Sequence, residues 1–258
     1  MDREFRLSQG DLKINGILSH PDYGEVQRVV LGVHGFGGSA NDEIQAGIAE
    51  EMGLFGAATL RFDFPAHGNS VMGSDMLTLG NCVNTLLAVA EYAKQQYPQV
   101  EKLCVFATGF GAYVTLIALQ ALLELPGQIR LVVQTPSVRM HETLLAMKGI
   151  SRETFWAMDR MTFPAPRPFE VTYSFYEELE QNIALTSYPI PMLILHGEAD
   201  SFIRMQDIQQ FHRINEQSKL VILPGTSHRF LEDGAWDRVL DLTRDWFEFE
   251  QVLLSDWE

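Results

Sequence analysis

The chain has 258 residues, a formal net charge of -15 at pH 7, and hydrophobic residues at 46% of its positions. This length and composition suit one large α/β domain with a full hydrophobic core, and they argue against disorder. The excess negative charge and the lack of a Lys/Arg-rich run argue against nucleic acid and anionic membrane surfaces as binding partners.

In chain order, the sequence predicts an N-terminal antiparallel hairpin followed by alternating strands and helices. The hairpin is expected at Glu4–Leu7 and Leu12–Leu18. The expected strands are Arg28–Val33, Ala57–Phe64, Leu103–Ala107, Ile129–Gln134, Met192–Leu195 and Leu220–Leu223. The expected helices are Asp42–Phe55, Asp75–Gln96, Phe110–Leu125, Arg204–Ile214 and Trp236–Leu254. This alternation predicts an α/β fold with a mostly parallel twisted sheet and helices on both faces.

The sequence between the fourth and fifth of these strands is too long for a single crossover. Residues 138–188 are therefore expected to form an insertion in a core domain made of residues 1–137 and 189–258. The insertion has helix-like pieces rich in methionine and aromatic residues, and a stiff proline-containing link, Phe163–Phe169. Two interpretations are open. It is either a helical insertion packed on its own small core, or a lid over the carboxyl edge of the sheet, where open α/β folds bind ligands.

The N-terminal sequence and the two cysteines give information about cellular location. The first ten residues contain no apolar signal core, and no uninterrupted apolar run is long enough to span a bilayer. Cys82 and Cys104 lie in segments with the patterns of a buried helix and a buried strand, so free thiols in a reducing compartment are favoured over a disulfide. These features predict a cytoplasmic protein.

The segment Ala107-Thr108-Gly109-Phe110-Gly111 joins a buried strand to a helix through a glycine-dense turn. This is the layout of a nucleophile elbow, G-x-S-x-G, in which a sharp turn exposes one side chain. The nucleophile position holds Gly109, which has no side chain. An elbow strains that residue by about 1–3 kcal/mol, whereas glycine adopts the required backbone angles freely. Gly109 is therefore expected to stabilise the turn while removing a nucleophilic hydroxyl.

Five motifs in this order resemble those of the α/β-hydrolase family. They are His34-Gly35-Phe36-Gly37-Gly38, Arg61–Ser70, the Gly109 turn, His196–Asp200 and Gly225–His228. The resemblance covers nearly the whole chain outside the insertion. The Phe36 and Arg61–Ser70 details look most like small intracellular carboxylesterases of the cinnamoyl/feruloyl esterase type. The resemblance implies the α/β-hydrolase fold with a helical lid, and small acyl esters as substrates.

The resemblance also implies roles for residues of the site, in the order nucleophile, acid, histidine. The acid is Asp200 and the base is His228, while Gly109 fills the nucleophile position. A carboxylate bonded to one imidazole nitrogen leaves the other as a proton acceptor. The oxyanion hole would consist of the backbone N–H groups of Phe36 and Phe110, the latter at the start of a helix.

Simpler interpretations of these residues remain open. His228 could cap the final helix or be satisfied in its loop, Asp200 could be a surface carboxylate, and the Phe36 motif could be an ordinary glycine-rich turn. Four further side chains are interpreted as structural, through turn hydrogen bonds and core contacts: Asp63, His67, His34 and His196.

No other residue is a convincing substitute for the missing nucleophile. The side chain of Thr108 is expected to turn away from the slot, and Cys104 is expected in the core. Ser39 follows the Phe36 loop and could approach the pocket, but it is expected to cap the helix that begins near Asn41. The sequence has no metal-ligand spacing, P-loop or dinucleotide-binding motif, so no metal or cofactor is expected.

Two functions from different classes follow. The first is a carboxylesterase-type hydrolase scaffold for small acyl esters, in which Gly109 is an introduced substitution or an eroded nucleophile. The second is a non-catalytic pseudo-hydrolase that binds a small ligand or a partner without turnover. Acid–base chemistry by the Asp–His pair without a covalent intermediate is a weaker third hypothesis. The expected partner is a small ester or carboxylic acid, and the sequence does not predict an oligomeric state.

Overall fold

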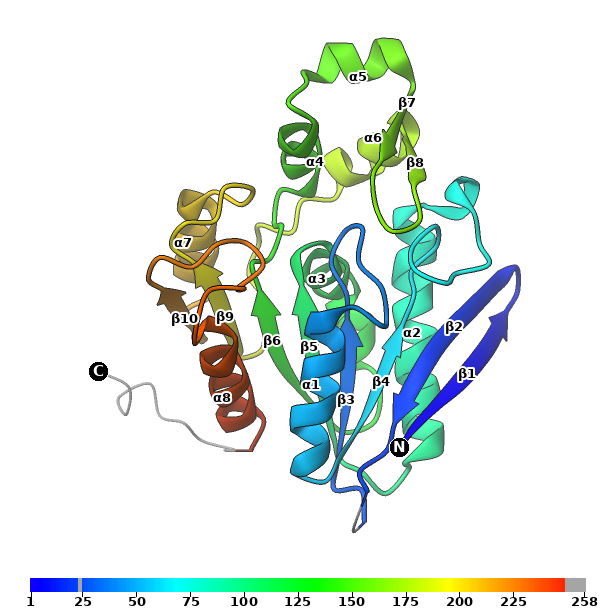
Figure 1. Ribbon diagram of the computed structural model, residues 1–258, viewed down its shortest axis with the longest axis vertical. Helices are drawn as coiled ribbons and strands as arrows, with labels where there is room; N and C mark the ends of the chain where they lie inside the picture. Colours follow the sequence, from blue (N-terminus) through cyan, green and yellow to red (C-terminus); the bar gives the residue numbers. More distant parts are fainter. Residues whose placement is uncertain (23–24, 249–258) are drawn as a thin grey trace.

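In the computed structural model, which describes residues 1–22 and 25–248, eight strands form one sheet in the order β1-β2-β4-β3-β5-β6-β9-β10 (Figure 1). The strands are β1 (Asp2–Gln9), β2 (Leu12–Ser19), β3 (Arg28–Val33), β4 (Ala57–Phe62), β5 (Lys102–Thr108), β6 (Gln128–Gln134), β9 (Met192–Gly197) and β10 (Ser218–Leu223). The β1–β2 and β2–β4 pairs are antiparallel, and the other neighbouring pairs are parallel. The predicted α/β class, the N-terminal hairpin and the mostly parallel sheet are confirmed.

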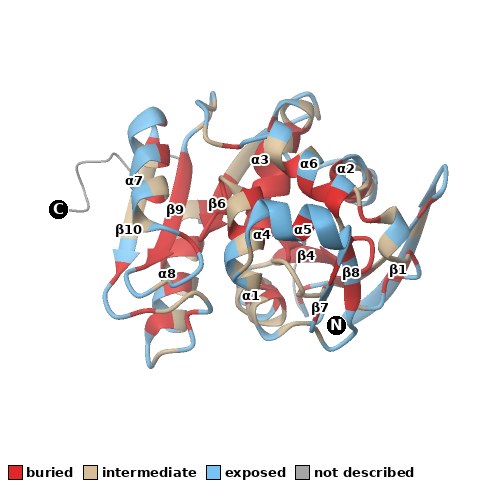
Figure 2. Cartoon of the chain, turned by 90° about the horizontal axis from the view of Figure 1, so that it is seen from above, coloured by how far each residue is buried: buried red, intermediate tan, exposed pale blue. Residues whose placement is uncertain are grey.

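Helices cover both faces of the sheet (Figure 2). The helices of the described residues are α1 (Glu43–Leu54), α2 (Leu79–Gln96), α3 (Gly109–Leu123), α4 (Met140–Lys148), α5 (Arg152–Met158), α6 (Tyr173–Gln181), α7 (Met205–Ile214), α8 (Ala235–Glu248) and the short 3-10 helix η1 (Ser74–Met76). Side chains of α1 and α8 belong to one apolar cluster, and those of α2, α3 and α7 to another. The strands between the two clusters are buried on both faces, which explains their continuous apolar sequences.

The packing of the central strands shows this alternation residue by residue. Val29 and Leu31 of β3 pack in the cluster with α2 and α3, while Val30 between them packs in the cluster with α1 and α8. Cys104 and Phe106 of β5 face the same way as Val30. Successive side chains of a strand point to opposite faces, so one strand supplies both layers of the core.

The start of α2 and the cap of α1 differ from the prediction. The helix expected from Asp75 begins at Leu79, since the hydroxyl of Thr78 accepts a hydrogen bond from the backbone N–H of Asn81 at 3.1 Å. Helix α1 is capped by Asp42, whose carboxylate accepts from the Gln45 N–H at 2.9 Å, and not by Ser39. Of the expected final helix, residues 249–254 lie outside the described residues.

The insertion, residues 138–188, was predicted to be helical, but it is only partly so. It contains α4, α5 and α6, and also a two-stranded antiparallel sheet of β7 (Arg160–Phe163) and β8 (Phe169–Thr172). Phe163 pairs with Phe169, so the expected stiff link is the loop of a hairpin. The prolines of the link turn the chain back, and buried residues alternate with exposed ones along both short strands.

The insertion lies over the carboxyl ends of the central strands (Figure 1). Glu178 of α6 accepts a hydrogen bond from the Leu79 N–H at 2.6 Å, at the start of α2. The Tyr113 hydroxyl of α3 donates to the Asn182 carbonyl at 2.7 Å. Buried side chains of the insertion belong to the same apolar cluster as α2 and α3. The insertion is therefore packed on the main core, and does not have a separate one.

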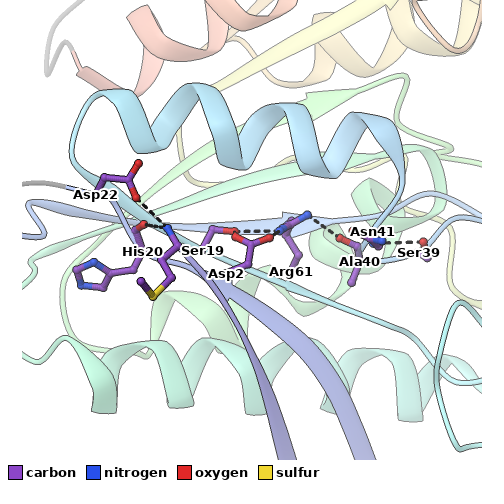
Figure 3. Close-up of polar contacts among 9 residues, drawn as sticks. Asp2, Ser19, His20, Asp22, Ser39, Ala40, Asn41 and Arg61 are labelled. Atoms are coloured by element: carbon purple, nitrogen blue, oxygen red, sulfur yellow. Dashed lines mark hydrogen bonds and ion pairs between the residues drawn. The ribbon is translucent and has the colours of Figure 1, made fainter.

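Besides the pairing of β2 with β4, a buried cation holds the N-terminal hairpin to the rest of the sheet. This cation is Arg61 of β4, which is 2% exposed. Its guanidinium donates to the carboxylate of Asp2 and the hydroxyl of Ser19, both at 2.9 Å, and to the carbonyl of Ala40 at 3.2 Å (Figure 3). A buried guanidinium is costly unless its charge is compensated. Asp2 is the carboxylate that provides this compensation.

We therefore expect Asp2→Ala to lower the free energy of unfolding by about 1–2 kcal/mol, because it removes a charged acceptor from a buried donor. Asp22→Ala is the matched control, because Asp22 pairs with the N-terminal amine (Figure 3) and both groups are exposed to solvent. The control should change stability by about 0.5 kcal/mol or less. Urea denaturation of both variants measures the difference, and equal effects would contradict this role for Asp2.

Candidate active site

The turn between β5 and α3 has the geometry that an elbow requires. Gly109 has a φ of +48°, in the left-handed region that favours glycine. A Cβ added at Gly109 would meet only the Cα of Gly35 and the Nε2 of His228, each at 4.0 Å. A Cβ added at Gly111 would instead collide with the carbonyl oxygens of His34 and Val33. Position 111 therefore requires glycine for close packing, whereas position 109 has room for a side chain that faces His228.

Asp200 and His228, which are 28 residues apart in the chain, are brought together by neighbouring strands. Asp200 follows β9 and His228 follows β10, and these strands pair in parallel. The Nδ1 of His228 donates to the Oδ2 of Asp200 at 2.8 Å. The other oxygen, Oδ1, accepts from the backbone N–H groups of Phe202 at 2.8 Å and Ile203 at 3.0 Å. The carboxylate is thus held in place on both sides.

The environment of Asp200 keeps it ionised. Burial acts to raise the pKa of its carboxyl group, but the hydrogen bond and charge of His228, together with the two backbone N–H donors, lower it below its usual range. An ionised Asp200 accepts the Nδ1–H of His228, so in the neutral tautomer of the ring the proton is on Nδ1. The Nε2 then has a free lone pair on the side of Gly109.

The loop that carries His228 is anchored by residues that the sequence analysis did not identify. Phe230 is fully buried with a φ of +55°, and its N–H donates to the carbonyl of Ser227 at 3.3 Å. Glu232 accepts from the Ser227 N–H at 2.9 Å. The ring of Phe202 lies 5.2 Å from that of His228, in edge-to-face geometry. A bulky residue at positive φ indicates a backbone held by its surroundings, and no local sequence pattern predicts it.

The two backbone N–H groups assigned to an oxyanion hole belong to the residue that follows Gly109 in α3 and to the loop that follows β3. Phe110 is in the first turn of α3, where amide protons have no partner within the helix. Phe36 follows β3, in a tight turn with Gly37 at a φ of +76° and a hydrogen bond from the Gly38 N–H to the Gly35 carbonyl at 3.0 Å. The rings of Phe36 and Phe110 pack edge to face, with centroids 5.5 Å apart.

The four side chains interpreted as structural are buried around these loops. The Nε2 of His34 accepts from the Phe64 N–H at 3.1 Å, and the carboxylate of Asp63 accepts from the N–H groups of Ala40 at 2.7 Å and Asn69 at 2.9 Å. His67 donates to the Pro65 carbonyl at 2.8 Å, and burial lowers its pKa to about 3, so it is neutral.

The last of the four, His196, lies behind Asp200. Its Nδ1 is 3.9 Å from the Asp200 Oδ2, and neither ring nitrogen has a hydrogen-bond partner among the described residues. Burial lowers the pKa of His196, which keeps the ring neutral. It therefore packs against the carboxylate without competing with His228 for it.

None of the three residues considered as substitutes for the nucleophile takes the place of a hydroxyl at Gly109. The hydroxyl of Thr108 points to the carbonyl of Val33, at 3.5 Å. Cys104 is in the middle of β5, and burial raises the pKa of its thiol to about 12, which makes it unreactive. Ser39 lines the cavity described below, and its hydroxyl accepts from the Asn41 N–H at 3.3 Å.

A cavity of about 1120 Å³ opens over the Gly109 turn and brings the predicted residues together. Gly109, His228, Phe36 and Phe110 all line it, whereas Asp200 lies behind His228. The insertion lines one side of the cavity with apolar side chains, which include Met147, Ala165, Phe163 and Phe169, and with two cations, Lys148 and Arg167. The rings of Phe163 and Phe169 have their centroids 5.0 Å and 5.2 Å from that of Phe36. Sequence analysis did not identify two polar wall residues at the end of β6, Gln134 and Ser137.

Within residues 1–22 and 25–248, no group of three or more His, Cys, Asp or Glu side chains is arranged to hold a metal ion. The helices of that part of the chain include none that is both long and apolar enough to cross a bilayer.

Solved structures with a similar fold include esterases and hydrolases. Est1E from Butyrivibrio proteoclasticus, in a structure with ferulic acid bound, superposes with a TM-score of 0.78 at 20% identity, covering 94% of this chain and 97% of that chain. Alpha/beta hydrolase domain-containing protein 10 from mouse gives 0.73 at 18% identity, with 94% and 97% covered. The Pyrococcus furiosus esterase Pf2001 gives 0.66 at 21% identity, with 96% and 93% covered.

No protein-family model matches the chain, and no curated protein sequence matches it. The structural similarity nevertheless extends over almost the whole length of both chains in each comparison. The chain has the α/β-hydrolase fold, which confirms the resemblance inferred from its five sequence motifs.

Proposed function

We propose that this chain is a carboxylesterase-type scaffold that binds a small acyl ester or carboxylic acid in the cavity over Gly109. The observation that carries the proposal is the Asp200–His228 pair, which leaves the His228 Nε2 4.0 Å from where a Cβ on Gly109 would stand. Phe36 and Phe110, whose N–H groups would form the oxyanion hole, line the same cavity. A base, an oxyanion hole and a nucleophile position would thus converge on one point.

The missing hydroxyl determines what the site does with an ester. Without a side chain at Gly109, the acyl-enzyme intermediate of a serine hydrolase cannot form there. In an intact triad, removing the serine lowers kcat by about a millionfold. We therefore assign binding without efficient turnover to the chain, which would make it a pseudoenzyme with the apparatus of an esterase.

The insertion would serve as the lid of this cavity. Its apolar side chains form one wall, and its hairpin loop carries Ala165 to within 3.9 Å of the position of a Cβ on Gly37. Apolar walls with a few polar groups are typical of sites for small, partly hydrophobic molecules. The structural similarity to an esterase with a bound aromatic acid supports a ligand of this class. The buried free thiols of Cys82 and Cys104 support a cytoplasmic location.

The proposal is tested on the unmodified chain with p-nitrophenyl butyrate and with butyrate. We expect both to shift the NMR signals of residues that line the cavity, while the release of p-nitrophenol stays close to the rate without protein. If no short ester or carboxylic acid binds to the chain at millimolar concentration, the proposal is contradicted.

The retained Asp–His pair favours one alternative, in which His228 activates a water molecule directly and the chain is a slow hydrolase. The same assay separates the two functions. Release of p-nitrophenol by the unmodified chain that is abolished in His228→Ala would establish hydrolysis and rule out a purely binding role.

A further inference from the structure

Gln134, at the end of β6, is one of the residues that line the cavity, and its buried side chain has an oxygen without a hydrogen-bond partner among the described residues. Gln134 is the last residue of β6, 1% exposed, and it pairs with Thr108 immediately before Gly109. Its Oε1 has no hydrogen-bond partner among the described residues. A buried amide oxygen without a partner is destabilising, and apolar side chains of similar volume would avoid this loss. Its presence in a cavity wall therefore needs an explanation, and a ligand that supplies the missing partner provides one.

The turn after Gln134 shows a second, independent sign of function. Thr135 is a buried β-branched residue with a φ of +43°, a conformation that such residues rarely adopt. Its N–H donates to the Leu195 carbonyl at 2.7 Å. Two residues later, the N–H of Ser137 donates to the Gly109 carbonyl at 3.2 Å. This strained turn is thus fixed to the Gly109 turn, and strain of this kind concentrates at ligand-binding positions.

The position of Ser137 adds a hydroxyl group to the same part of the wall. Ser137 is 2% exposed and lines the cavity together with Gln134, Gly109 and His228. The insertion supplies an apolar wall of Phe163, Phe169 and Met147 to this cavity. A ligand that satisfies both kinds of wall has an apolar body and a polar group that can donate a hydrogen bond.

We propose that Gln134 and Ser137 form a polar subsite that selects esters or acids with a hydroxyl group on the acyl chain. The ligand hydroxyl donates its proton to the Gln134 Oε1, and the Ser137 hydroxyl donates to the oxygen of that ligand hydroxyl. This inference rests on the proposed function and narrows its ligand class. Gln134 is then a specificity-determining residue whose unsatisfied oxygen is matched only in the complex.

The test measures the affinity of the unmodified chain for methyl hexanoate and for its 2-, 3- and 6-hydroxy derivatives, by ligand-observed NMR titration. We expect at least one hydroxy ester to bind about 5- to 100-fold more tightly than methyl hexanoate, the range for satisfying a buried polar group. In Gln134→Met, the affinity for that hydroxy ester should fall to the affinity for methyl hexanoate. The same variant without ligand should melt about 2–4 °C higher, because it removes the unsatisfied amide.

Thr85→Val is the matched control. Thr85 is a fully buried residue of α2 whose hydroxyl also lacks a partner among the described residues, but it does not line the cavity. This variant should gain stability and keep the preference for the hydroxy ester. Ser137→Ala and Gln134→Leu provide independent tests, because each should reduce that preference.

The outcomes separate the two proposals. If none of the four esters binds, the proposed function fails, and the subsite fails with it. If all four bind equally, or if the preference survives in Gln134→Met, only the subsite is overturned. A Gln134→Met chain that is less stable or does not fold also overturns it, because the amide would then have a structural role.

Discussion

Gly109→Ser is expected to convert the chain into an active esterase. A Cβ at this position has room, and it would stand 4.0 Å from the Nε2 of His228. A hydroxyl one bond further out then comes within hydrogen-bond reach of that nitrogen, roughly 2.6–3.2 Å. With the Asp200–His228 pair and the two backbone N–H groups already placed, the variant should hydrolyse p-nitrophenyl butyrate at least about a thousandfold faster than the unmodified chain.

A second readout of the same variant is covalent. The new serine should be labelled by a fluorophosphonate probe, and tandem mass spectrometry should locate the label at position 109. The unmodified chain should not be labelled there, because it has no hydroxyl. Since a residue other than glycine is strained at a φ of +48°, the variant should also lose about 1 kcal/mol of stability.

Gly109→Ala is the control that separates strain from chemistry. It adds the same Cβ at the same backbone angles, so it should lose as much stability as the serine variant. It should gain neither labelling nor esterase activity. A folded serine variant that stays unlabelled and inactive would show that this turn is not a latent elbow.

The fold could be predicted in large part because the strands of a parallel sheet are buried on both faces. This burial requires continuous apolar runs such as Arg28–Val33, which are easily read from the sequence. Errors occurred where local signals compete. Ser39 and Asp42 are both good capping residues and lie three positions apart in the chain. In the structure Asp42 is the N-cap of α1, and its carboxylate also accepts from the Ser39 N–H. The β7–β8 hairpin was missed because its strands have only four residues each.

The candidate site was predicted to the extent that its residues follow the ends of strands. The resemblance assigned the roles of Asp200 and His228, and both lie in the loops that follow β9 and β10, which places them at one edge of the sheet. Gln134 and Phe230 could not be found in this way. The importance of Gln134 depends on an unsatisfied oxygen, and that of Phe230 on a positive φ, which tertiary packing imposes and sequence patterns do not reveal.

Asp200→Asn, introduced into the Gly109→Ser variant, is expected to lower kcat by about ten-thousandfold. The asparagine can still meet His228, but its amide nitrogen donates where the carboxylate oxygen accepted. The imidazole would then have its proton on Nε2, which can no longer take the proton of Ser at position 109. The side chain of Asp200 is fully buried against His228, so solvent does not replace the lost charge.

Steady-state kinetics with p-nitrophenyl butyrate measure this loss, and Glu198→Gln in the same background is its control. Glu198 is an acid of the same loop, and its carboxylate accepts from the Gly225 N–H at 2.9 Å, whereas the carboxylate bonded to His228 is that of Asp200. Its replacement changes the net charge equally and should leave kcat within about threefold, because an amide oxygen still accepts that bond. If Asp200→Asn loses less than about tenfold, His228 does not depend on Asp200 for its tautomer, and the two residues are not the acid and base of a triad.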